Sequence, residues 1–379
     1  MSDGDPSIAR FHAVCAPGLE AVTVAEIAAL GGAEIASTRG GVGFSGPLAL
    51  GFRANLWLRT AVEVRLRLAR FHAPSERLLA ERAREVAWRS FLRAGEGVEV
   101  RVSVSRSRLA HTGRIAELVA AAAGASPAAV APGAQRLHAR LVNDTATLSI
   151  DMSGELLHRR GYRQETGPAP LRETIAAALL LALDWNGTTP LIDPLCGSGT
   201  IPIEAALIAL RIAPGLRRSF ACERWPASER ATWEGLRAEA AALVLPALPA
   251  PIAGSDRNAG AVGVAQRNAE RAQVAAHVAL ERRFLADAAP PPGVGPGLLL
   301  ANPPYGRRVR EVADLGPLYA EIGRVVAARF GGWRAAVVNA DPALDVHLGL
   351  PRQQEIPFLH GGLRCRLIEL AVAAAPRSV

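Results

Sequence analysis

The residues Asn302, Pro303, Pro304 and Tyr305 carry the most specific chemical signal in the chain. They follow the apolar run Leu298–Leu300, which predicts a strand that delivers them at its carboxyl end, the edge where open α/β sheets bind ligands. The two prolines fix φ at about −65° and have no N–H group, so the loop is stiff and its carbonyl oxygens face a partner. An asparagine beside these carbonyls favours a ligand that donates two hydrogens, such as an amino group.

This arrangement suits methyl transfer to an amino group on an aromatic ring, whose nitrogen is a poor nucleophile because its lone pair is delocalised. If the Asn302 side-chain oxygen and the Pro303 carbonyl accept both hydrogens, the nitrogen can become pyramidal and aim that lone pair at an electrophilic methyl group. Alignment and electrostatic stabilisation then supply most of the barrier reduction, and no base is needed first. Tyr305 would stack on the ring, which contributes about 1–3 kcal/mol. The alternative interpretation is a proline turn with a packed tyrosine.

A glycine turn follows another apolar run, Pro190–Ile192, which ends at Asp193. Gly197 and Gly199 permit a tight turn just before Thr200, where a helical pattern begins. Such a turn lets backbone N–H groups approach a ligand at a helix N-terminus. The pattern alone is weak evidence for a nucleotide-like cofactor, because glycine turns after strands are often only structural.

Acidic residues at two further strand ends strengthen the cofactor interpretation. Asp256, followed by Arg257, ends a strand-like run at the tip of which a carboxylate can accept both hydroxyls of a ribose. Asp287 lies where a third strand would end and could meet an adenine amino group; taken alone it would be a surface acid. Gly199 and Asp256 are 57 residues apart, whereas a compact dinucleotide fold separates them by about 20. The excess, Arg211–Ala240, predicts a helical insertion that is either solvated or faces RNA.

The elements that must position these residues differ between the two halves of the chain. The C-terminal half alternates short apolar runs with helical patterns, which is typical of a doubly wound parallel sheet. It ends in a hairpin signal around His360–Gly362. The N-terminal half predicts two smaller α+β units, with one amphipathic helix over Ser75–Phe91 and a tight turn at Asn143-Asp144 between two strands.

Composition favours an intracellular enzyme with a polyanionic partner. The 379 residues contain no lysine, the formal charge is +8 and the isoelectric point is about 10.4, which suits RNA but also follows from biased coding composition. Four cysteines lie far apart without a CxxC pair, so we expect free thiols and no metal site. No secretory signal or membrane span is evident. We expect a cytoplasmic monomer.

Two longer strings, HRRGYRQETGPAPLRETIAAALLLALDW and DPLCGSGTIPIEAALIA, together with GSDRN and NPPYG in this order, resemble a known family. DPLCGSGT, GSDRN and NPPYG in this order resemble the class I amino-methyltransferases, and the two longer strings resemble the THUMP-domain guanine-N2 RNA methyltransferases. The similarity covers most of the chain. It implies a ferredoxin-like unit over 1–45, a THUMP domain over 46–155, a linker over 156–170 and a seven-stranded, Rossmann-like methyltransferase domain over 171–379.

The resemblance also implies a cofactor and roles for residues. The cofactor is S-adenosylmethionine, with the methionine end near the glycine turn, the ribose at Asp256, the adenine at Asp287 and the target base at Asn302–Tyr305. The implied cofactor-binding set is Asp193, Gly197, Gly199, Thr200, Asp256, Arg257, Asp287 and Asn302. The arginines expected to contact RNA are Arg101, Arg106, Arg108, Arg114, Arg160 and Arg163.

The predicted reaction is formation of N2-methylguanosine, with 23S ribosomal RNA preferred and transfer RNA as the alternative. The NPPY tetrapeptide is shared by enzymes that methylate adenine N6, cytosine N4 and glutamine amides, so it names the type of atom and not the substrate. Two hypotheses of other classes stay open. One is a protein glutamine N5-methyltransferase, and the other is a non-catalytic RNA-binding factor with the same fold.

Overall fold

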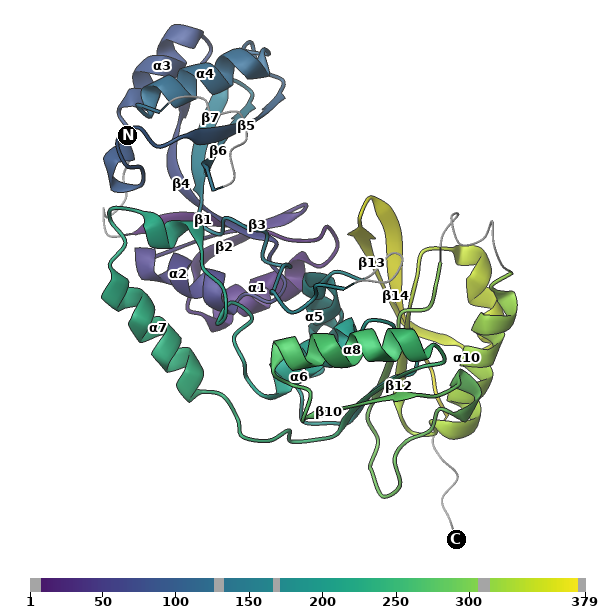
Figure 1. Ribbon diagram of the computed structural model, residues 1–379. Helices are drawn as coiled ribbons and strands as arrows, with labels where there is room; N and C mark the ends of the chain where they lie inside the picture. Colours follow the sequence, from purple (N-terminus) through teal and green to yellow (C-terminus); the bar gives the residue numbers. More distant parts are fainter. Residues whose placement is uncertain (1–7, 126–132, 166–170, 306–313, 374–379) are drawn as a thin grey trace. The chain divides into compact units, whose positions relative to one another are not determined.

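The structure is a computed structural model that describes residues 8–125, 133–165, 171–305 and 314–373 (Figure 1). The chain divides into two compact units. Unit 1 comprises residues 1–15, 23–157 and 215–240, and unit 2 comprises 16–22, 158–214 and 241–379. Among the described residues, each unit contains one seven-stranded sheet.

The sheet of unit 1 combines the two predicted α+β groups in a single set of strands. Its order is β2-β3-β1-β4-β7-β6-β5, antiparallel throughout except for the parallel pair β5 and β6. The strands are β1 (Ala9–Val14), β2 (Ala33–Thr38), β3 (Gly41–Gly46), β4 (Glu63–His72), β5 (Val98–Ser105), β6 (Gln135–Val142) and β7 (Thr145–Asp151). The predicted tight turn is confirmed, because Asn143 and Asp144 have φ of 49° and 55° between β6 and β7, as a two-residue hairpin requires.

Helices cover the apolar side of this sheet. They are α1 (Glu20–Ala29), α2 (Leu48–Trp57), α3 (Glu76–Arg84) and α4 (Thr112–Ala122), and α4 packs on β5 and β6. The prediction of one helix over Ser75–Phe91 was wrong. Ser75 caps α3, but α3 ends at Arg84 and a separate turn of 3₁₀-helix, η1, spans Trp88–Ser90. The cause is Trp88, which turns into the core and donates its indole N–H to the Ala83 carbonyl.

The predicted insertion belongs to unit 1, although the chain enters it from unit 2 and returns to unit 2 afterwards. It contains η2 (Ala221–Arg224) and α7 (Arg230–Ala242). The buried Trp233 packs its ring 5.0 Å from Phe52 and 5.4 Å from Phe220, and Trp225 donates its indole N–H to Gln135 at 2.9 Å. One face of the insertion therefore packs into the core of unit 1, which neither of the two interpretations made from the sequence included.

We predict that Trp233→Ala destabilises unit 1 by about 3–5 kcal/mol, because it removes a buried aromatic ring from between two others. Urea unfolding followed by far-ultraviolet circular dichroism measures the change. Arg230→Ala is the control, since its side chain is 91% exposed on the same helix and its loss should cost less than about 0.5 kcal/mol. A Trp233→Ala midpoint equal to that of the control would contradict the packing role.

The sheet of unit 2 has the order β10-β9-β8-β11-β12-β14-β13. The first five strands in this order are parallel, and β14 and β13 form an antiparallel hairpin at the edge. The strands are β8 (Leu191–Asp193), β9 (Ile252–Asp256), β10 (Val278–Arg282), β11 (Leu298–Ala301), β12 (Arg334–Asn339), β13 (Arg352–His360) and β14 (Leu363–Leu370). This confirms the predicted doubly wound sheet with a terminal hairpin.

The helices of unit 2 pack against this sheet and leave one edge of it for the site. They are α5 (Glu173–Ala182), α6 (Thr200–Ala209), α8 (Ala259–Ala272) and α10 (Gly316–Arg329), with short 3₁₀ turns η3 (Leu285–Asp287) and η4 (Pro342–Leu348). Between α10 and the sheet lies an apolar core that includes Ile322, Val326, Leu299 and Val337. None of the helices in the described ranges is both long and apolar enough to cross a bilayer.

Candidate active site

The site residues predicted from sequence follow neighbouring strands of unit 2. β8 lies between β9 and β11, with Asp193 opposite Gly254 and Ile192 opposite Leu299. Because these strands are parallel, their carboxyl ends meet at one edge of the sheet. The structure therefore places Asp256, Asp193 and Asn302 at the ends of three adjacent strands, as the spacing of the motifs predicts.

The turn after β8 depends on two glycines in the left-handed region. Gly197 has φ of 51°, and a side chain added there would meet no atom within 4 Å, so the space above it is open to a ligand. Gly199 has φ of 82° at the N-cap of α6, and an added Cβ would lie 2.9 Å from the Cβ of Ala265 on α8. Gly199 thus serves both the turn and the close packing of two helices, while Thr200, the first residue of α6, is buried.

Asp256 is held so that its carboxylate keeps acceptor capacity for a ligand. One carboxylate oxygen accepts the Gly197 N–H at 3.1 Å, and the other accepts the Asn258 N–H at 2.9 Å. A carboxylate has about four acceptor positions, so two stay available for the hydroxyls of a ribose. Arg257 and Asp287 are both exposed, Asp287 at the end of η3 beyond the neighbouring strand β10.

Asp193 differs from Asp256 because it is almost completely buried, with 1% of its surface exposed. The pKa of its carboxyl is raised from about 3.8 to about 8, chiefly by burial; the Leu195 N–H lowers the pKa and the nearby charge of Asp256 raises it, and both effects are included in that value. That N–H donates to it at 3.1 Å. A buried carboxyl beside an open glycine turn is suited to a ligand group that is positive or donates hydrogen bonds, since such a group favours the ionised form.

The raised pKa gives a prediction for stability without ligand. The folded chain keeps a proton that unfolded Asp193 has released, so its stability should fall as the pH rises from about 4 to about 8, by at most about 1.4 kcal/mol per pH unit. Asp193→Asn removes this dependence and should be more stable than the natural chain by an amount that grows over the same range. Thermal unfolding at several pH values measures it, with exposed Asp184→Asn as control. Parallel curves for Asp193→Asn and the natural chain would contradict the burial effect.

The loop after β11 leaves an acceptor without a partner. The side-chain oxygen Oδ1 of Asn302 is buried and makes no hydrogen bond to any of the described residues. Such an atom costs about 1–3 kcal/mol of free energy unless a ligand supplies a donor. Tyr305 is partly buried, which raises the pKa of its hydroxyl, and Cys365 on β14 points its thiol at that oxygen from 3.9 Å. The tyrosine is therefore neutral, as a stacking residue should be.

A group of buried polar residues supports this loop, and sequence reasoning missed it. The Tyr319 hydroxyl on α10 lies 3.5 Å from the Pro304 carbonyl and 3.1 Å from Oδ1 of Asn339 at the end of β12. Asn339 donates in turn to Asp345, which is paired with Arg366 of β14 at 2.6 Å. The available signal was the polar sequence Asn339-Ala340-Asp341 directly after an apolar strand, the same pattern that marks the other strand ends.

A second group braces the glycine turn from α8. Asn268 is fully buried and donates to the Ser198 carbonyl at 3.1 Å, directly before Gly199. Its own oxygen accepts from Arg271, and the Arg271 guanidinium also donates to Glu165 at 2.6 Å. Glu165 belongs to the segment interpreted as a linker, so this segment is part of the support for the turn.

The arginines expected to contact RNA divide into two groups. Arg101, Arg106, Arg108 and Arg114 lie on the surface around the end of β5 and the start of α4. Three of these are ion-paired, Arg101 with Glu99, Arg108 with Asp144, and Arg114 with both Glu76 and Glu117.

Arg160 and Arg163 require a correction, because they belong to the interior of unit 2. The Arg160 side chain is 3% exposed and lies 3.6 Å from Glu204, while Arg163 pairs with Glu173 at 2.8 Å and donates to the Leu171 carbonyl. Between them Tyr162, also buried, donates to Glu204. The segment is polar because it supplies the partners of buried glutamates, so its arginines are not placed to bind RNA directly.

No group of histidine, cysteine or acidic side chains within the described ranges is arranged to hold a metal ion.

The strand order, the glycine turn and the polar strand ends together define a class I methyltransferase domain. Residues 160–368 match the family described as UPF0020, RMKL-like, methyltransferase domain, and residues 10–64 match the RlmL ferredoxin-like domain. The chain belongs to this RMKL-like methyltransferase family, as the sequence motifs indicated.

Comparison with individual proteins gives the sequence identity and the share of each chain that the similarity covers. It is 37% identical to the ribosomal RNA large subunit methyltransferase K/L of Syntrophotalea carbinolica, over 96% of this chain and 54% of that protein. It is 33% identical to the putative RNA methyltransferase slr0064 of Synechocystis, over 95% of this chain and 96% of that one. The crystal structure of SMU.472, a putative methyltransferase complexed with SAH, superimposes with a TM-score of 0.87 at 28% identity, covering 98% of this chain and all of that one. The chain spans about half the length of the ribosomal relatives.

Proposed function

We propose that this chain is an S-adenosylmethionine-dependent RNA methyltransferase that forms N2-methylguanosine, with 23S ribosomal RNA as the preferred substrate. Family membership supports the reaction type, and the K/L relatives, named for large-subunit ribosomal RNA, support the substrate. Transfer RNA is the alternative, because the relative that matches along nearly its whole length is named only as a putative RNA methyltransferase. We expect the enzyme to act as a monomer in the cytoplasm.

The observation that carries the proposal is the buried Oδ1 of Asn302 at the carboxyl end of β11, which has no hydrogen-bond partner among the described residues. An amino group that donates to this oxygen would remove the cost of leaving it unsatisfied. The same contact would hold the nitrogen in the direction required for attack. A purely structural loop would have no reason to keep a buried acceptor open at the edge of the sheet where ligands bind.

The residues around the glycine turn fit S-adenosylmethionine. We expect the buried Asp193 to bind the amino group of the methionine part, the open space above Gly197 to admit the ligand to the backbone, and the free acceptor positions of Asp256 to bind the ribose hydroxyls. The exposed Asp287 would meet the adenine, and Thr200 and Arg257 flank the same turn and strand end. When bound, the cofactor supplies a methyl group on a positively charged sulfur.

The chain's own residues then have to orient the target base. Asn302 accepts one amino hydrogen, and the Pro303 carbonyl accepts the other, so the nitrogen lone pair is directed away from the ring. Tyr305 stacks on the base, and Tyr319 fixes the loop through Pro304. A base held in this way has left its helical stack, so a loop, bulge or loosened stem is the expected target.

The direct test is transfer of radiolabelled methyl groups to unmodified total RNA, followed by digestion to nucleosides and separate counting of ribosomal and transfer RNA. Label in N2-methylguanosine from the 23S fraction is the expected result. Label in the transfer RNA fraction instead would select the alternative substrate. Label found in nuclease-treated protein extract would support the glutamine methyltransferase hypothesis, and a chain that binds no cofactor in calorimetry would support the non-catalytic one.

We predict that Asn302→Ala lowers kcat by about 10²–10³, the loss typical of removing one oriented polar group from a transition state. Affinity for S-adenosylhomocysteine, measured by calorimetry, should change less than about threefold, because Asn302 acts mainly on the base. Asn186→Ala, an exposed asparagine of the same unit, is the control and should keep full activity. Turnover of Asn302→Ala close to that of the control would refute the mechanism.

Asp256→Ala should show the complementary pattern. Its carboxylate both offers acceptors to the ribose and holds the Gly197 N–H, so its loss weakens cofactor binding before and during the reaction. We expect the Kd for S-adenosylhomocysteine to rise at least tenfold, and kcat at saturating cofactor to fall less than in Asn302→Ala. Unchanged affinity in calorimetry would remove Asp256 from the cofactor site.

A further inference from the structure

The polar face of the sheet in unit 1 gathers arginines from three strands. Arg10 on β1 lies directly opposite Arg67 on β4, and Arg70 on β4 and Arg140 on β6 both pair with Thr147 on the strand between them. Residues that pair directly across strands share a face of the sheet. These four residues, Arg10, Arg67, Arg70 and Arg140, are called the sheet-face arginines.

A β-bulge in β4 makes this grouping possible. Arg67 and Arg70 are three positions apart, so in a regular strand their side chains would point to opposite faces. The register shifts between Arg67 and Ala69, which leaves Leu68 as the extra residue and returns Arg70 to the face of Arg67. A bulge of this kind re-aims a side chain at some cost to the strand ladder. Here it adds another positive charge to a face that already holds several.

Three of the four sheet-face arginines, Arg67, Arg70 and Arg140, differ from the other arginines around them in lacking an acidic partner among the described residues. Further along the same face, Arg65 pairs with Glu63 and Arg136 pairs with Asp151. Within the part of the chain that the structure describes, no carboxylate lies within ion-pairing distance of Arg67, Arg70 or Arg140, whereas Arg10 pairs with Glu34 at 3.7 Å between two exposed side chains. This face therefore carries uncompensated positive charge.

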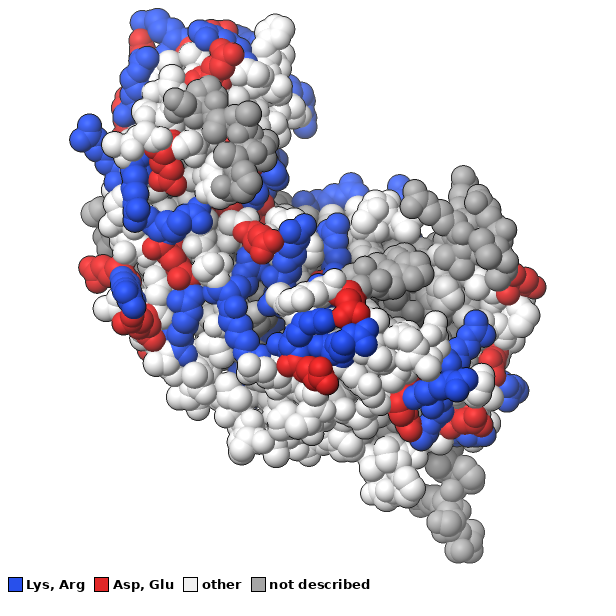
Figure 2. Space-filling view, viewed as in Figure 1, with Lys and Arg blue, Asp and Glu red and all other residues white. Residues whose placement is uncertain are grey.

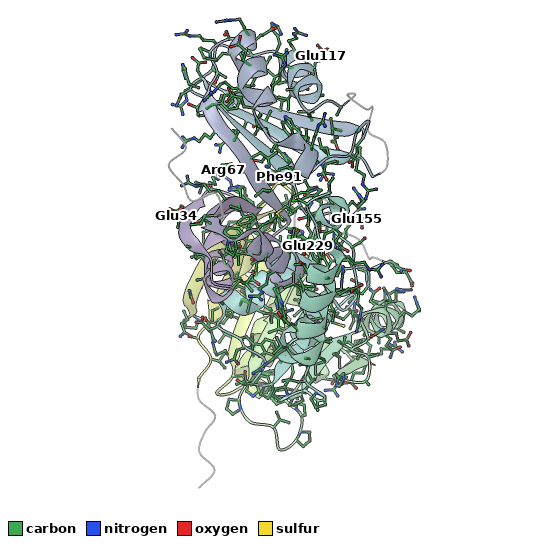
Figure 3. All side chains as sticks on the ribbon, turned by 90° about the vertical axis from the view of Figure 1, so that its left-hand side faces the viewer. Glu34, Arg67, Phe91, Glu117, Glu155 and Glu229 are labelled. Carbon is green, nitrogen blue, oxygen red and sulfur yellow. The ribbon has the colours of Figure 1, made fainter. Side chains whose placement is uncertain are left out.

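The electrostatic cost of that charge is visible at Arg67. Burial lowers the pKa of its guanidinium, and the neighbouring Arg70, Arg10 and Arg140 lower it further. Arg67 on β4, labelled in Figure 3, is partly buried, whereas Arg10, Arg70 and Arg140 are exposed. The helical side of the same unit is different, since blue and red side chains lie next to one another over α3 and α4 (Figure 2), where Arg77, Arg82 and Arg114 have acidic partners.

We propose that the sheet-face arginines bind the phosphodiester backbone of the substrate RNA, an inference that rests on the proposed function of the chain. Guanidinium groups match phosphate oxygens in charge and geometry, and a phosphate would relieve the repulsion among the four. β1 and β6 are separated by three strand spacings of about 4.8 Å, so the group spans about 14 Å and contacts more than one phosphate. These phosphate contacts do not depend on the base sequence of the RNA. They would position the RNA, while Asn302 would select the base.

This face is a better phosphate site than the arginines chosen from sequence. Arg101, Arg108 and Arg114 must each release a carboxylate before they can bind a phosphate. Among the described residues, Arg10 is the only sheet-face arginine with such a partner, Glu34, and Arg67, Arg70 and Arg140 have no carboxylate to release. Sequence reasoning missed them because their spacing along the chain is irregular, and only strand pairing brings residues 10, 67, 70 and 140 together.

The test compares two double variants that lose the same charge. Arg67→Gln with Arg140→Gln removes half of the group, and Arg84→Gln with Arg89→Gln removes two exposed arginines of the same unit that have no acidic partner among the described residues. Binding of an unmodified 23S ribosomal RNA transcript is measured by fluorescence anisotropy at several salt concentrations. The slope of log K against log salt is negative, and loss of two phosphate contacts should reduce its magnitude by about 1.4–1.8. RNA binding should weaken at least tenfold, and the control double variant should change little.

The affinity for S-adenosylhomocysteine should be equal in both double variants and in the natural chain, which shows that the cofactor site in unit 2 is intact, and equal urea-unfolding midpoints show that unit 1 is folded. Equal RNA affinity and salt slope in the two double variants would overturn the proposal. If the natural chain binds the RNA through these arginines but transfers no methyl group to it, the docking surface stands and the proposed reaction fails. If the natural chain does not bind the RNA at all, both fail.

Discussion

The candidate site depends on the parallel pairing of β9, β8 and β11. Parallel strands end at the same edge, and backbone groups there are no longer used by the sheet, so polar side chains and turns can collect without burying unsatisfied groups. Asp256, Asp193 and Asn302 come from three segments of sequence separated by at least forty-six residues, yet the register brings them to adjacent positions. The close packing of α6 on α8 at Gly199 keeps the central turn in place.

The polar residues beneath the site are as much part of it as those that would touch a ligand. Tyr319, Asn339 and Asp345 form a continuous set of hydrogen bonds under the loop after β11, and Asn268 with Arg271 does the same for the turn after β8. Buried networks of this kind hold their members in one geometry because each lost partner leaves an unsatisfied group. They explain how an exposed edge can present Asn302 and Asp256 in fixed positions.

The long connection between α6 and β9 does more than join two parallel strands of unit 2, because part of it packs into unit 1. Residues 215–240 leave unit 2, fill the aromatic core of unit 1 through Trp225 and Trp233, and return. Part of the hydrophobic burial of unit 1 is therefore supplied by a segment that is continuous with the catalytic fold. Dividing the chain at one position between the two units would leave residues 215–240 with unit 2 and remove them from the core of unit 1.

The sequence by itself determined the local features and led to the reaction that we propose. The apolar runs, the glycine turn and the Asn143-Asp144 hairpin are short-range patterns whose physics acts within a few residues, and the NPPY, DPLCGSGT and GSDRN strings gave the order of the site residues along the chain. Only the tertiary structure decided which polar residues face inward. Arg160 and Arg163 have the same composition signal as surface arginines, but Glu204 and Glu173 draw them into the core. Likewise the sheet-face arginines and the destination of residues 215–240 follow from strand register and packing between distant segments, which no local pattern encodes.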